Sequence, residues 1–214
     1  MKRIILSYPA SIENELEKVN ELLTDNEIDF FHLRKLDFDY TQMKDYLAKI
    51  DDDLHNKIII HSHYSLITDF DLAGINLNRK ALNQLVYADE VDKCFIQPLV
   101  LNNRQIEVNR ELPNMVTYSA HSFEEVNNLV FDVDYAFLSP IYDSISKQNY
   151  KSNFTDKNKL KQELIKTNTK VIALGGVTDG KVNELKDLGF DGVAQLGNYW
   201  ENILNEKHNF SNLA

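Results

Sequence analysis

Glycine is scarce in this chain, in which only 7 of the 214 residues are glycine. Gly74 stands alone, and the other six fall between positions 175 and 197. Glycine adopts left-handed backbone conformations most readily and lets a backbone approach a ligand closely. The segment 171–200 is therefore the part of the chain around which we organise the rest.

Cysteine, basic charge and long apolar runs are also lacking. The single cysteine, Cys94, cannot form an internal disulfide, which favours a reducing, cytoplasmic setting. The formal net charge is -10 and no basic stripe is visible, which argues against nucleic-acid binding and against anionic membranes. The apolar segment 1–9 is too short for a membrane span or a signal peptide.

The composition that is present is ordinary for a globular protein. Hydrophobic residues make up 43% of the chain and charged residues 26%. A chain of 214 residues has the length of one domain with a substantial core. We therefore expect a single domain over residues 1–214.

The segment 171–200 has the pattern of two consecutive strand and helix units. Residues 171–174 are all apolar, as expected for a parallel strand covered on both faces, and a glycine pair ends the run. A helix follows, which Thr178 or the next residue can cap and which Gly189 ends. Residues 191–197 then repeat the strand and glycine pattern.

Glycines at the ends of two neighbouring strands are typical of a phosphate site. They let backbone N–H groups approach an anion, beside the positive ends of the helices that follow. In an eight-stranded α/β barrel, the phosphate site lies in the last two units. The alternative is that these glycines are ordinary turn residues, which would suit any Rossmann-like sheet.

The same alternation of strands and helices runs through the rest of the chain. Strands are predicted over 4–6, 28–34, 57–60, 74–78, 116–120 and 135–138, and helices over 11–23, 40–50, 64–72, 81–92, 122–130 and 198–206. Residues 79–114 are hard to interpret and are treated as an insertion. Strict alternation predicts a parallel (β/α)8 TIM barrel, and an open doubly wound sheet is the second choice.

In such a barrel the chemistry lies where the strands end at their carboxyl side. The residues predicted there are mostly polar: His32, Arg34, His61, His63, Asn76, Asn78, Ser119, His121, the segment 139–147, Gly176 and Gly197. The cations Arg34 and Lys147 suit an anionic ligand.

Histidine is the side chain that exchanges a proton most readily near neutral pH. His121 lies just past a predicted strand end and is the main candidate for acid-base catalysis; the alternative is an exposed histidine at a helix entry. His61, His63 and His121 are also a candidate three-histidine metal site, although no carboxylate obviously completes the set. Local hydrogen bonding is the more ordinary role for the first two.

The predicted loop 139–147 reads SPIYDSISK, with hydroxyls two residues apart and a lysine. Hydroxyls and an ammonium group suit phosphate oxygens. A polar surface loop would explain any one of these residues, but it explains the apolar entry at 140–142 less well.

Five segments, taken in order, resemble one family. They are HLR at 32–34, YSAHS at 118–122, SPIYDSISK at 139–147, ALGGV at 173–177 and DGVA at 191–194. Together they resemble thiamine phosphate synthase and its thiazole tautomerase (TenI-like) branch, over nearly the whole chain. The synthase joins hydroxymethylpyrimidine pyrophosphate to thiazole phosphate with Mg²⁺, whereas the tautomerase shifts a double bond in thiazole carboxylate phosphate.

The resemblance implies roles for individual residues. Arg34, Ser119 and Lys147 match positions that contact pyrophosphate, and Ser144 and Ser146 match hydroxyl positions near the phosphates. Gly176, Leu196 and Gly197 match backbone donors to the thiazole phosphate. His121 matches the histidine assigned to proton transfer in the tautomerase. The family commonly forms dimers, so the resemblance also implies a homodimer.

The chain departs from the synthase pattern at the metal-binding positions. Where the synthase has Asn-Asp, this chain has His61-Ser62, and where it has Gly-Gln-x-Asp, this chain has residues 78–81, NRKA. Both Mg²⁺ carboxylates are therefore missing. Arg79 or Lys80 is a candidate for supplying positive charge in their place.

The Gln-Leu-Arg-x-Lys motif is also altered. His32 replaces its glutamine, and its lysine is lost or displaced to Lys35. His32 and His61 are still expected to bind substrate from these positions. The departures favour metal-independent, tautomerase-like chemistry, with authentic synthase activity as the alternative. A non-catalytic phosphate-binding or regulatory relative is the second alternative.

Overall fold

The computed structural model describes residues 1–84, 113–129, 131–143, 151–201 and 203–204. Eight parallel strands close into a barrel in chain order, β1 to β8, and β8 pairs with β1. The strands are β1 (Lys2–Leu6), β2 (Phe30–Leu33), β3 (Ile58–Ile60), β4 (Gly74–Asn78), β5 (Met115–Ala120), β6 (Tyr135–Leu138), β7 (Val171–Ala173) and β8 (Gly192–Gln195). The predicted (β/α)8 barrel is confirmed, and the open doubly wound sheet is excluded.

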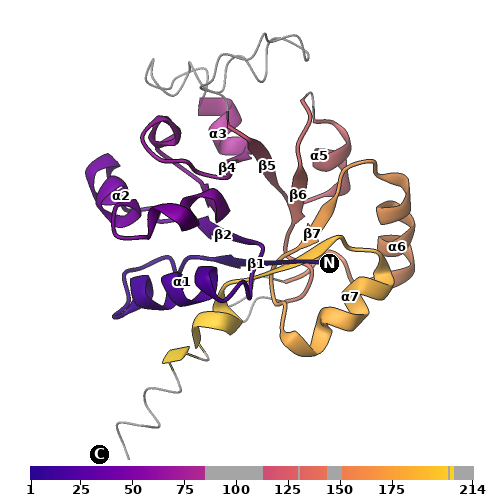
Figure 1. Ribbon diagram of the computed structural model, residues 1–214. Helices are drawn as coiled ribbons and strands as arrows, with labels where there is room; N and C mark the ends of the chain where they lie inside the picture. The colour runs from indigo at the N-terminus through magenta and orange to yellow at the C-terminus, as the bar shows by residue number, and fades with distance from the viewer. Residues whose placement is uncertain (85–112, 130, 144–150, 202, 205–214) are drawn as a thin grey trace, which may run out of the picture.

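Helices surround the barrel (Figure 1). The α-helices are α1 (Glu15–Thr24), α2 (Tyr40–Leu47), α3 (Arg79–Gln84), α5 (Phe123–Asn127), α6 (Lys157–Lys166) and α7 (Val182–Leu188). Short 3-10 helices are η1 (Asp52–Lys57), η2 (Tyr64–Thr68) and η3 (Asp179–Lys181). Residues 197–201 and 203–204 are also helical.

Several predicted elements need correction. The helix expected at 64–72 is only the 3-10 helix η2, which starts after His63 in a left-handed conformation. The helix after β7 begins with η3, and Thr178 precedes it without a side-chain cap. The helix α6 was not predicted. Most of the proposed insertion at 79–114 lies outside the described residues, so it stays a prediction.

The predicted helix end at Gly189 is confirmed, and two further helix caps are present. Gly189 ends α7 with φ 104°, the left-handed conformation that glycine accepts without strain. Ser122 caps α5 through a hydrogen bond from the Glu125 N–H. Asp39 and Gln42 form a reciprocal capping box at α2 that the sequence analysis missed.

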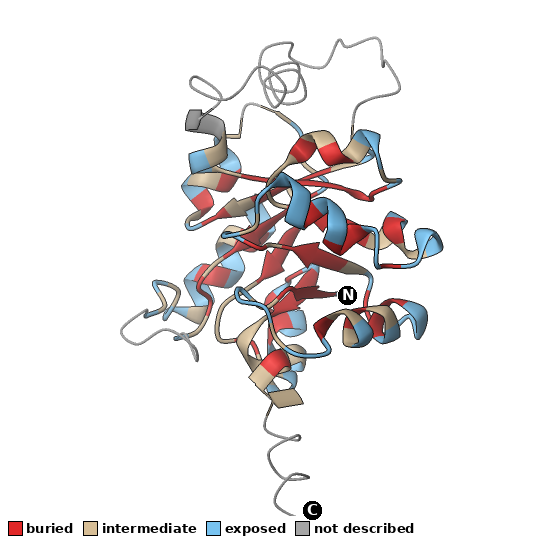
Figure 2. Cartoon of the chain, turned by 90° about the vertical axis from the view of Figure 1, so that its left-hand side faces the viewer, coloured by how far each residue is buried: buried red, intermediate tan, exposed pale blue. Residues whose placement is uncertain are grey.

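The core has an inner and an outer layer. Inside the barrel, apolar side chains from alternate strand positions pack together: Ile4, Leu6, Ile59, Tyr135, Phe137, Ile172 and Ala194. The intervening strand positions pack outward under the helices. Because both faces of the strands are covered, the strands are buried almost throughout (Figure 2).

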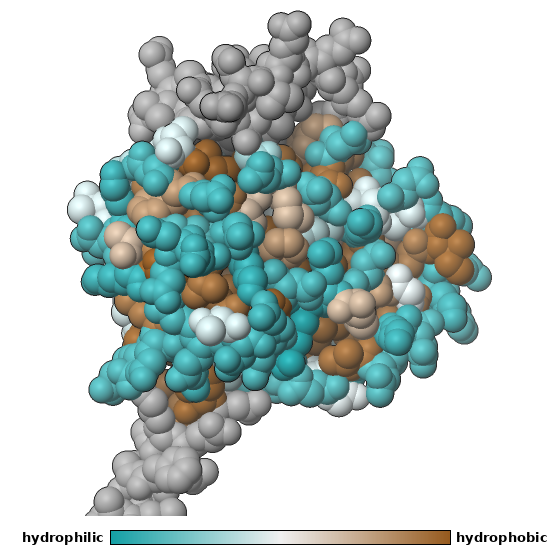
Figure 3. Space-filling view, viewed as in Figure 1, coloured by the Kyte–Doolittle hydropathy of each residue, from teal (hydrophilic) through white to brown (hydrophobic). Residues whose placement is uncertain are grey.

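The surface is mostly hydrophilic in the view of Figure 3, with hydrophobic residues in separate small areas. The exposed large hydrophobic side chains come from three separate parts of the described chain: Met1, Leu36 with Tyr40, and Ile165. Among the described residues, no helix is long and apolar enough to cross a membrane. The expected homodimer stays a prediction.

Candidate functional site

The predicted site residues within the described chain gather at one end of the barrel. Arg34 follows β2, His61 follows β3, and His121 follows β5, while Ser119 lies near the end of β5. Gly176 follows β7, and Leu196 and Gly197 follow β8. Parallel strands end on the same side of a barrel, so these residues surround one mouth. Ser144, Ser146 and Lys147 lie outside the described residues.

The turn after β7 is built against its neighbouring loop. The N–H of Ile141 donates to the carbonyl of Leu174 (2.9 Å), and the N–H of Tyr142 donates to that of Gly175 (3.0 Å). Gly176 has φ 63°, and a Cβ there would lie 2.4 Å from the carbonyl oxygen of Asp143. The close approach of loop 139–143 therefore requires glycine at this position.

The close contact with loop 139–143 leaves the Gly176 N–H able to donate to a ligand. No hydrogen bond within the described part of the chain uses the Gly176 N–H. The strands β7 and β8 are paired, with Ala173 opposite Val193, so the turns that follow them are neighbours.

The turn after β8 opens directly into a helical segment. Residues 197–201 are helical, and the N–H of Trp200 donates to the carbonyl of Leu196 (3.1 Å). The first N–H groups of a helix have no partner within the helix, so they suit an anion. The buried Trp200 indole donates to the carbonyl of Leu6 (2.7 Å), which fixes this segment against β1.

His121 is held in one orientation at the mouth. Its Nδ1 lies 2.8 Å from the carbonyl oxygen of Ser139, and its ring is exposed. A carbonyl only accepts a hydrogen bond, so Nδ1 carries the proton in the neutral ring. Nε2 is then the unprotonated nitrogen, and the neutral imidazole can act as a base through it.

The backbone of His121 is fixed by Glu125, which lies in the predicted helix 122–130. The Glu125 carboxylate accepts the N–H of His121 (3.0 Å) and pairs with the Arg79 guanidinium (2.6 Å). Arg79 had been a candidate for replacing metal charge. Its guanidinium instead neutralises Glu125, so the structure assigns it to the support of His121.

Arg34 is the half-buried cation at the mouth. Its backbone N–H donates to the Ser7 hydroxyl (2.8 Å), which fixes the start of the loop after β2. Burial lowers the pKa of Arg34, but a guanidinium stays charged at physiological pH. Within the described residues its side chain has no carboxylate partner, so its charge suits an anionic ligand.

Lys35 does not supply a second cation to the mouth. Its side chain is fully buried, and its Nζ donates to the carbonyls of Tyr8 and Ala10 (both 2.8 Å) and to Glu15 (2.5 Å). Burial raises the pKa of Glu15 and lowers that of Lys35, and the pairing opposes both shifts. Lys35 therefore holds the loop between β1 and α1 in place. The expectation that Lys35 replaces the lost phosphate-binding lysine is wrong.

Histidines from β2 and β3 form a pair inside the barrel. His32 Nδ1 lies 2.9 Å from His61 Nε2, and His32 Nε2 lies 2.7 Å from the Tyr135 hydroxyl. The amide nitrogen of Asn76 lies 3.2 Å from His61 Nδ1 and 2.9 Å from the Ser119 hydroxyl. His32 is fully buried with both nitrogens bonded, so it supports the site through His61 rather than contacting substrate as expected.

Both members of the pair are neutral at physiological pH. Burial lowers the pKa of His61 to about 3, with the Arg34 charge as the second cause. Burial lowers the pKa of His32 well below its usual value, and His61 adds to that effect.

The three candidate metal-binding histidines are each hydrogen-bonded to different partners. His61 bonds to His32 and Asn76, His63 Nε2 to the carbonyl of Phe38 (2.9 Å), and His121 to Ser139. In the described ranges, no group of three histidine, cysteine or acidic side chains is placed to hold a metal ion.

The donors at the expected Mg²⁺ positions do not fit that ion either. Mg²⁺ prefers carboxylate, phosphate and water oxygens. Ser62 and Ala81 stand at the two aspartate positions, so neither supplies a carboxylate. Beside them, Nδ1 of His61 is already bonded, and the amide oxygen of Asn78 accepts the N–H of Ala81 (2.8 Å). We therefore route no chemical step through a protein-bound metal.

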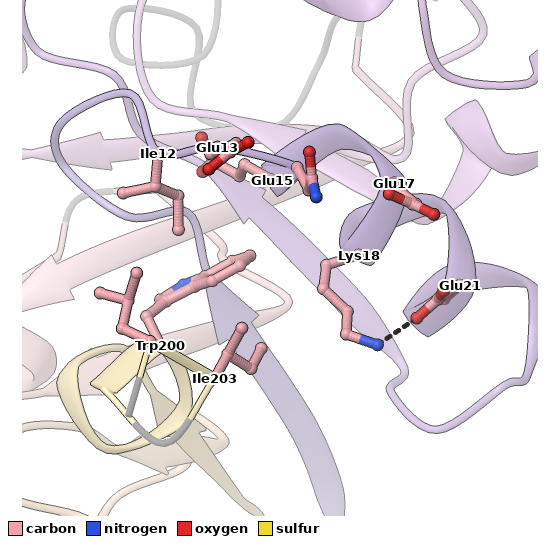
Figure 4. Close-up of a pocket in the computed structure, with 10 residues that line it drawn as sticks. Ile12, Glu13, Glu15, Glu17, Lys18, Glu21, Trp200 and Ile203 are labelled. Atoms are coloured by element: carbon pink, nitrogen blue, oxygen red, sulfur yellow. Dashed lines mark hydrogen bonds and ion pairs between the residues drawn. The ribbon is translucent and has the colours of Figure 1, made fainter. Parts of the chain in front are cut away.

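A cavity of about 160 Å³ lies away from the mouth residues, between α1 and the last helical segment (Figure 4). It is lined by Trp200 and by four acids, Glu13, Glu15, Glu17 and Glu21, among others. Lys18 pairs with Glu21 at its edge. So much negative charge disfavours a phosphate ligand, so we place the site at the mouth.

Asn76, Tyr135 and Glu125 are contributors that the sequence did not single out for these roles. Asn76 was named only as a strand-end residue, and Tyr135 only as the start of a strand. Their partners lie up to 103 positions away in the chain, so no local pattern marks them. A polar residue inside an apolar strand, such as Asn76, was the available signal.

The closed parallel barrel with a polar mouth defines a protein of the (β/α)8 class, with its candidate site at the strand ends. The family model described as thiamine monophosphate synthase (TMP-TENI) matches residues 101–198. No curated protein matches the chain significantly.

Solved structures are similar over a longer span of the chain. A thiamine phosphate pyrophosphorylase from Bacteroides thetaiotaomicron is 28% identical, with a TM-score of 0.69, over 94% of this chain and 85% of that chain. A thiamine phosphate pyrophosphorylase from Pyrococcus furiosus is 14% identical, with a TM-score of 0.62, over 91% of this chain and 84% of that one.

The Pyrococcus protein and a third structure, both below 25% identity, share the fold alone. The third structure is (S)-3-O-geranylgeranylglyceryl phosphate synthase from Thermoplasma acidophilum in complex with sn-glycerol-1-phosphate, 15% identical with a TM-score of 0.56, over 91% of this chain and 84% of that one. The family match and the similarity to the Bacteroides protein support the resemblance predicted from the sequence: the chain is similar to the thiamine monophosphate synthase and TenI-like proteins.

Proposed function

We propose that this protein is a cytoplasmic thiamine-biosynthesis enzyme that acts on a thiazole phosphate and catalyses tautomerase-like proton transfer without a protein-bound metal. The observation that carries the proposal is the geometry of His121. The carbonyl of Ser139 fixes the proton on Nδ1, and Nε2 is the ring nitrogen that can take a proton from a bound ligand and return it.

The surrounding groups suit a ligand that carries one phosphate. The turn at Gly176 and the helix start at Gly197 offer backbone N–H groups to the phosphate. Arg34 adds one positive charge, while His32 and His61 are neutral, and Lys35 is not available. A thiazole phosphate needs less positive charge than the departing pyrophosphate of the synthase reaction.

Authentic synthase activity is the alternative, and the structural similarity to two thiamine phosphate pyrophosphorylases favours it. In that reaction the protein would bind hydroxymethylpyrimidine pyrophosphate beside thiazole phosphate. Arg34, Ser119 and the segment 144–147 would contact the pyrophosphate, and Mg²⁺ would enter with the substrate rather than on protein carboxylates. A non-catalytic phosphate-binding relative is the remaining candidate.

The test is to assay both reactions with the purified protein. Thiazole tautomer conversion that is insensitive to EDTA supports the proposal. Thiamine phosphate formation that needs Mg²⁺ and is abolished by EDTA would replace it with the synthase. No product in either assay, together with micromolar binding of thiazole phosphate, would instead identify a binding protein.

A further inference from the structure

Five polar side chains form one continuous hydrogen-bonded chain through the barrel. It runs from Tyr135, which is fully buried, through His32, His61 and Asn76 to Ser119 at the mouth. The four contacts measure 2.7, 2.9, 3.2 and 2.9 Å in that order. No catalytic step proposed above uses this chain of contacts.

The chain of hydrogen bonds has a direction. A neutral histidine donates through one ring nitrogen and accepts through the other, so a donor at one end fixes every bond up to the next rotatable group. Low pKa values keep both histidines neutral. The Asn76 amide can turn by 180° and exchange its oxygen and nitrogen, because the two ends have the same shape. Only two arrangements therefore satisfy the contacts among the five side chains; the carbonyl of Leu77, 3.3 Å from the Asn76 amide nitrogen, has this donor only when the nitrogen faces His61.

In the first arrangement, Tyr135 donates to His32, His32 Nδ1–H donates to His61, and His61 Nδ1–H donates to the Asn76 oxygen. In the second, the Asn76 nitrogen donates to His61, and His61 and His32 both carry their protons on Nε2. The second arrangement makes the Tyr135 oxygen an acceptor. Its own proton then has no acceptor within the described chain, although burial raises the pKa of this hydroxyl and keeps it protonated.

Leaving one buried hydroxyl proton unpaired costs more than losing the long contact between Asn76 and Leu77, so the free protein should adopt the first arrangement. Thr117 fits either one, because its hydroxyl lies 2.9 Å from the Asn76 amide and 3.3 Å from the carbonyl of Ile75. Ser119 does not. When Asn76 turns its oxygen toward Ser119, the hydroxyl donates inward, and when Asn76 turns its nitrogen, the hydroxyl is free to donate to a ligand.

We propose that the hydrogen-bonded series from Tyr135 to Asn76 determines whether the Ser119 hydroxyl donates inward or toward a ligand. An anionic oxygen bound at Ser119 would then reverse the donor direction of the whole series. The inference rests on the proposed function in one respect: it takes from the synthase alternative described there that Ser119 faces a pyrophosphate oxygen. Each histidine keeps one proton, which changes from Nδ1 to Nε2 by exchange with solvent, so the reversal leaves the charge unchanged. The pair of His32 and His61 then lowers the affinity for an anion at Ser119 by about tenfold, which is the cost of leaving the Tyr135 proton unpaired.

The test is to measure the ring nitrogens of the histidines by NMR in the ¹⁵N-labelled full-length protein. Without ligand, His32 and His61 should both be neutral and carry the proton on Nδ1. At saturating inorganic pyrophosphate, both should carry it on Nε2. His55 and His63 are internal controls, because each bonds to a backbone carbonyl through Nε2 and lies outside the hydrogen-bonded series.

A second measurement uses His32→Phe, which interrupts the series of hydrogen bonds. The Tyr135 proton then no longer determines the orientation of the Asn76 amide. Pyrophosphate should bind this variant up to about tenfold more tightly, whereas His55→Phe, a buried histidine off the chain, should bind it as the wild type does.

Protons on Nε2 in the free protein would overturn the inference. So would unchanged tautomers when shifts of the Ser119 amide show that pyrophosphate is bound, and in that case the proposed function would stand. Failure of pyrophosphate to bind would overturn the ligand-driven reversal together with the role of Ser119, while the tautomers of the free protein would still decide the direction of the chain.

Discussion

Replacing Lys35 by methionine should destabilise the protein without weakening phosphate binding. Three oxygens surround Lys35 Nζ, and all three lose their donor in the Lys35→Met variant. Glu15, with only 4% of its side chain exposed, would keep a buried carboxylate without its counter-charge. Breaking a buried ion pair by removing one partner typically costs about 3–5 kcal/mol. We expect a loss in that range.

The matched control is Lys44→Met. Lys44 also pairs with a carboxylate, Asp69, at 2.7 Å, but its side chain is 49% exposed. Exposed pairs contribute little to stability, because solvent screens them. Urea unfolding of both variants measures the difference, and titration of the folded proteins with thiazole phosphate measures binding. Equal stability of the two variants, or weaker ligand binding by a fully stable Lys35→Met protein, would refute the assignment of Lys35 to the loop.

Three further predictions follow from the site. Because burial holds the pKa of His61 at about 3, against about 6.5 when unfolded, its contribution to the free energy of unfolding should be complete above pH 6.5. This contribution should fall by up to about 1.4 kcal/mol per pH unit as the pH drops toward 3. In urea unfolding, the stability of His61→Asn should therefore depend less on acid pH than that of the wild type. Identical dependence of stability on pH in the two proteins would contradict this. Gly176→Ala should cost about 1–3 kcal/mol and weaken binding of thiazole phosphate, because φ is 63° and the new Cβ would meet Asp143. Gly180→Ala, with open space around its Cβ, should change stability by less than about 1 kcal/mol in thermal melts; equal costs would argue against the tight turn. Glu125→Ala should lower kcat about tenfold with KM unchanged, and Glu125→Gln, which still accepts the N–H of His121, should restore most of it; a parallel loss in both variants would mean that the charge, not the hydrogen bond, matters.

The sequence predicts the barrel well because its strands are buried on both faces. Runs such as 171–174 and 57–60 are almost wholly apolar, and glycine and polar residues follow them at the same end of the sheet. The positions of Arg34, Ser119, His121 and Gly176 at the mouth follow from this alternation alone. The short helix at 64–68 was overpredicted because an apolar pattern does not distinguish an α-helix from a 3-10 turn.

The pairings within the site were not predictable in the same way. Lys35 lies next to Arg34 in the sequence, yet one side chain is buried under the loop after β1 and the other lies at the mouth. Adjacent residues point to opposite sides of an extended chain, and the sequence alone does not say which side is covered. The contact between His32 and Tyr135 joins residues 103 positions apart, so only the closed barrel reveals it.

The most direct test of the proposed function is the turnover of thiazole carboxylate phosphate by the wild type, by His121→Ala and by His63→Ala, all in EDTA. His63 is the matched control, because it also lies past a strand end but bonds to the carbonyl of Phe38. We predict that the wild type and His63→Ala convert the substrate and that His121→Ala is slower by about 10²- to 10⁴-fold, the usual contribution of general acid-base catalysis. Conversion by His121→Ala at the wild-type rate would contradict the account.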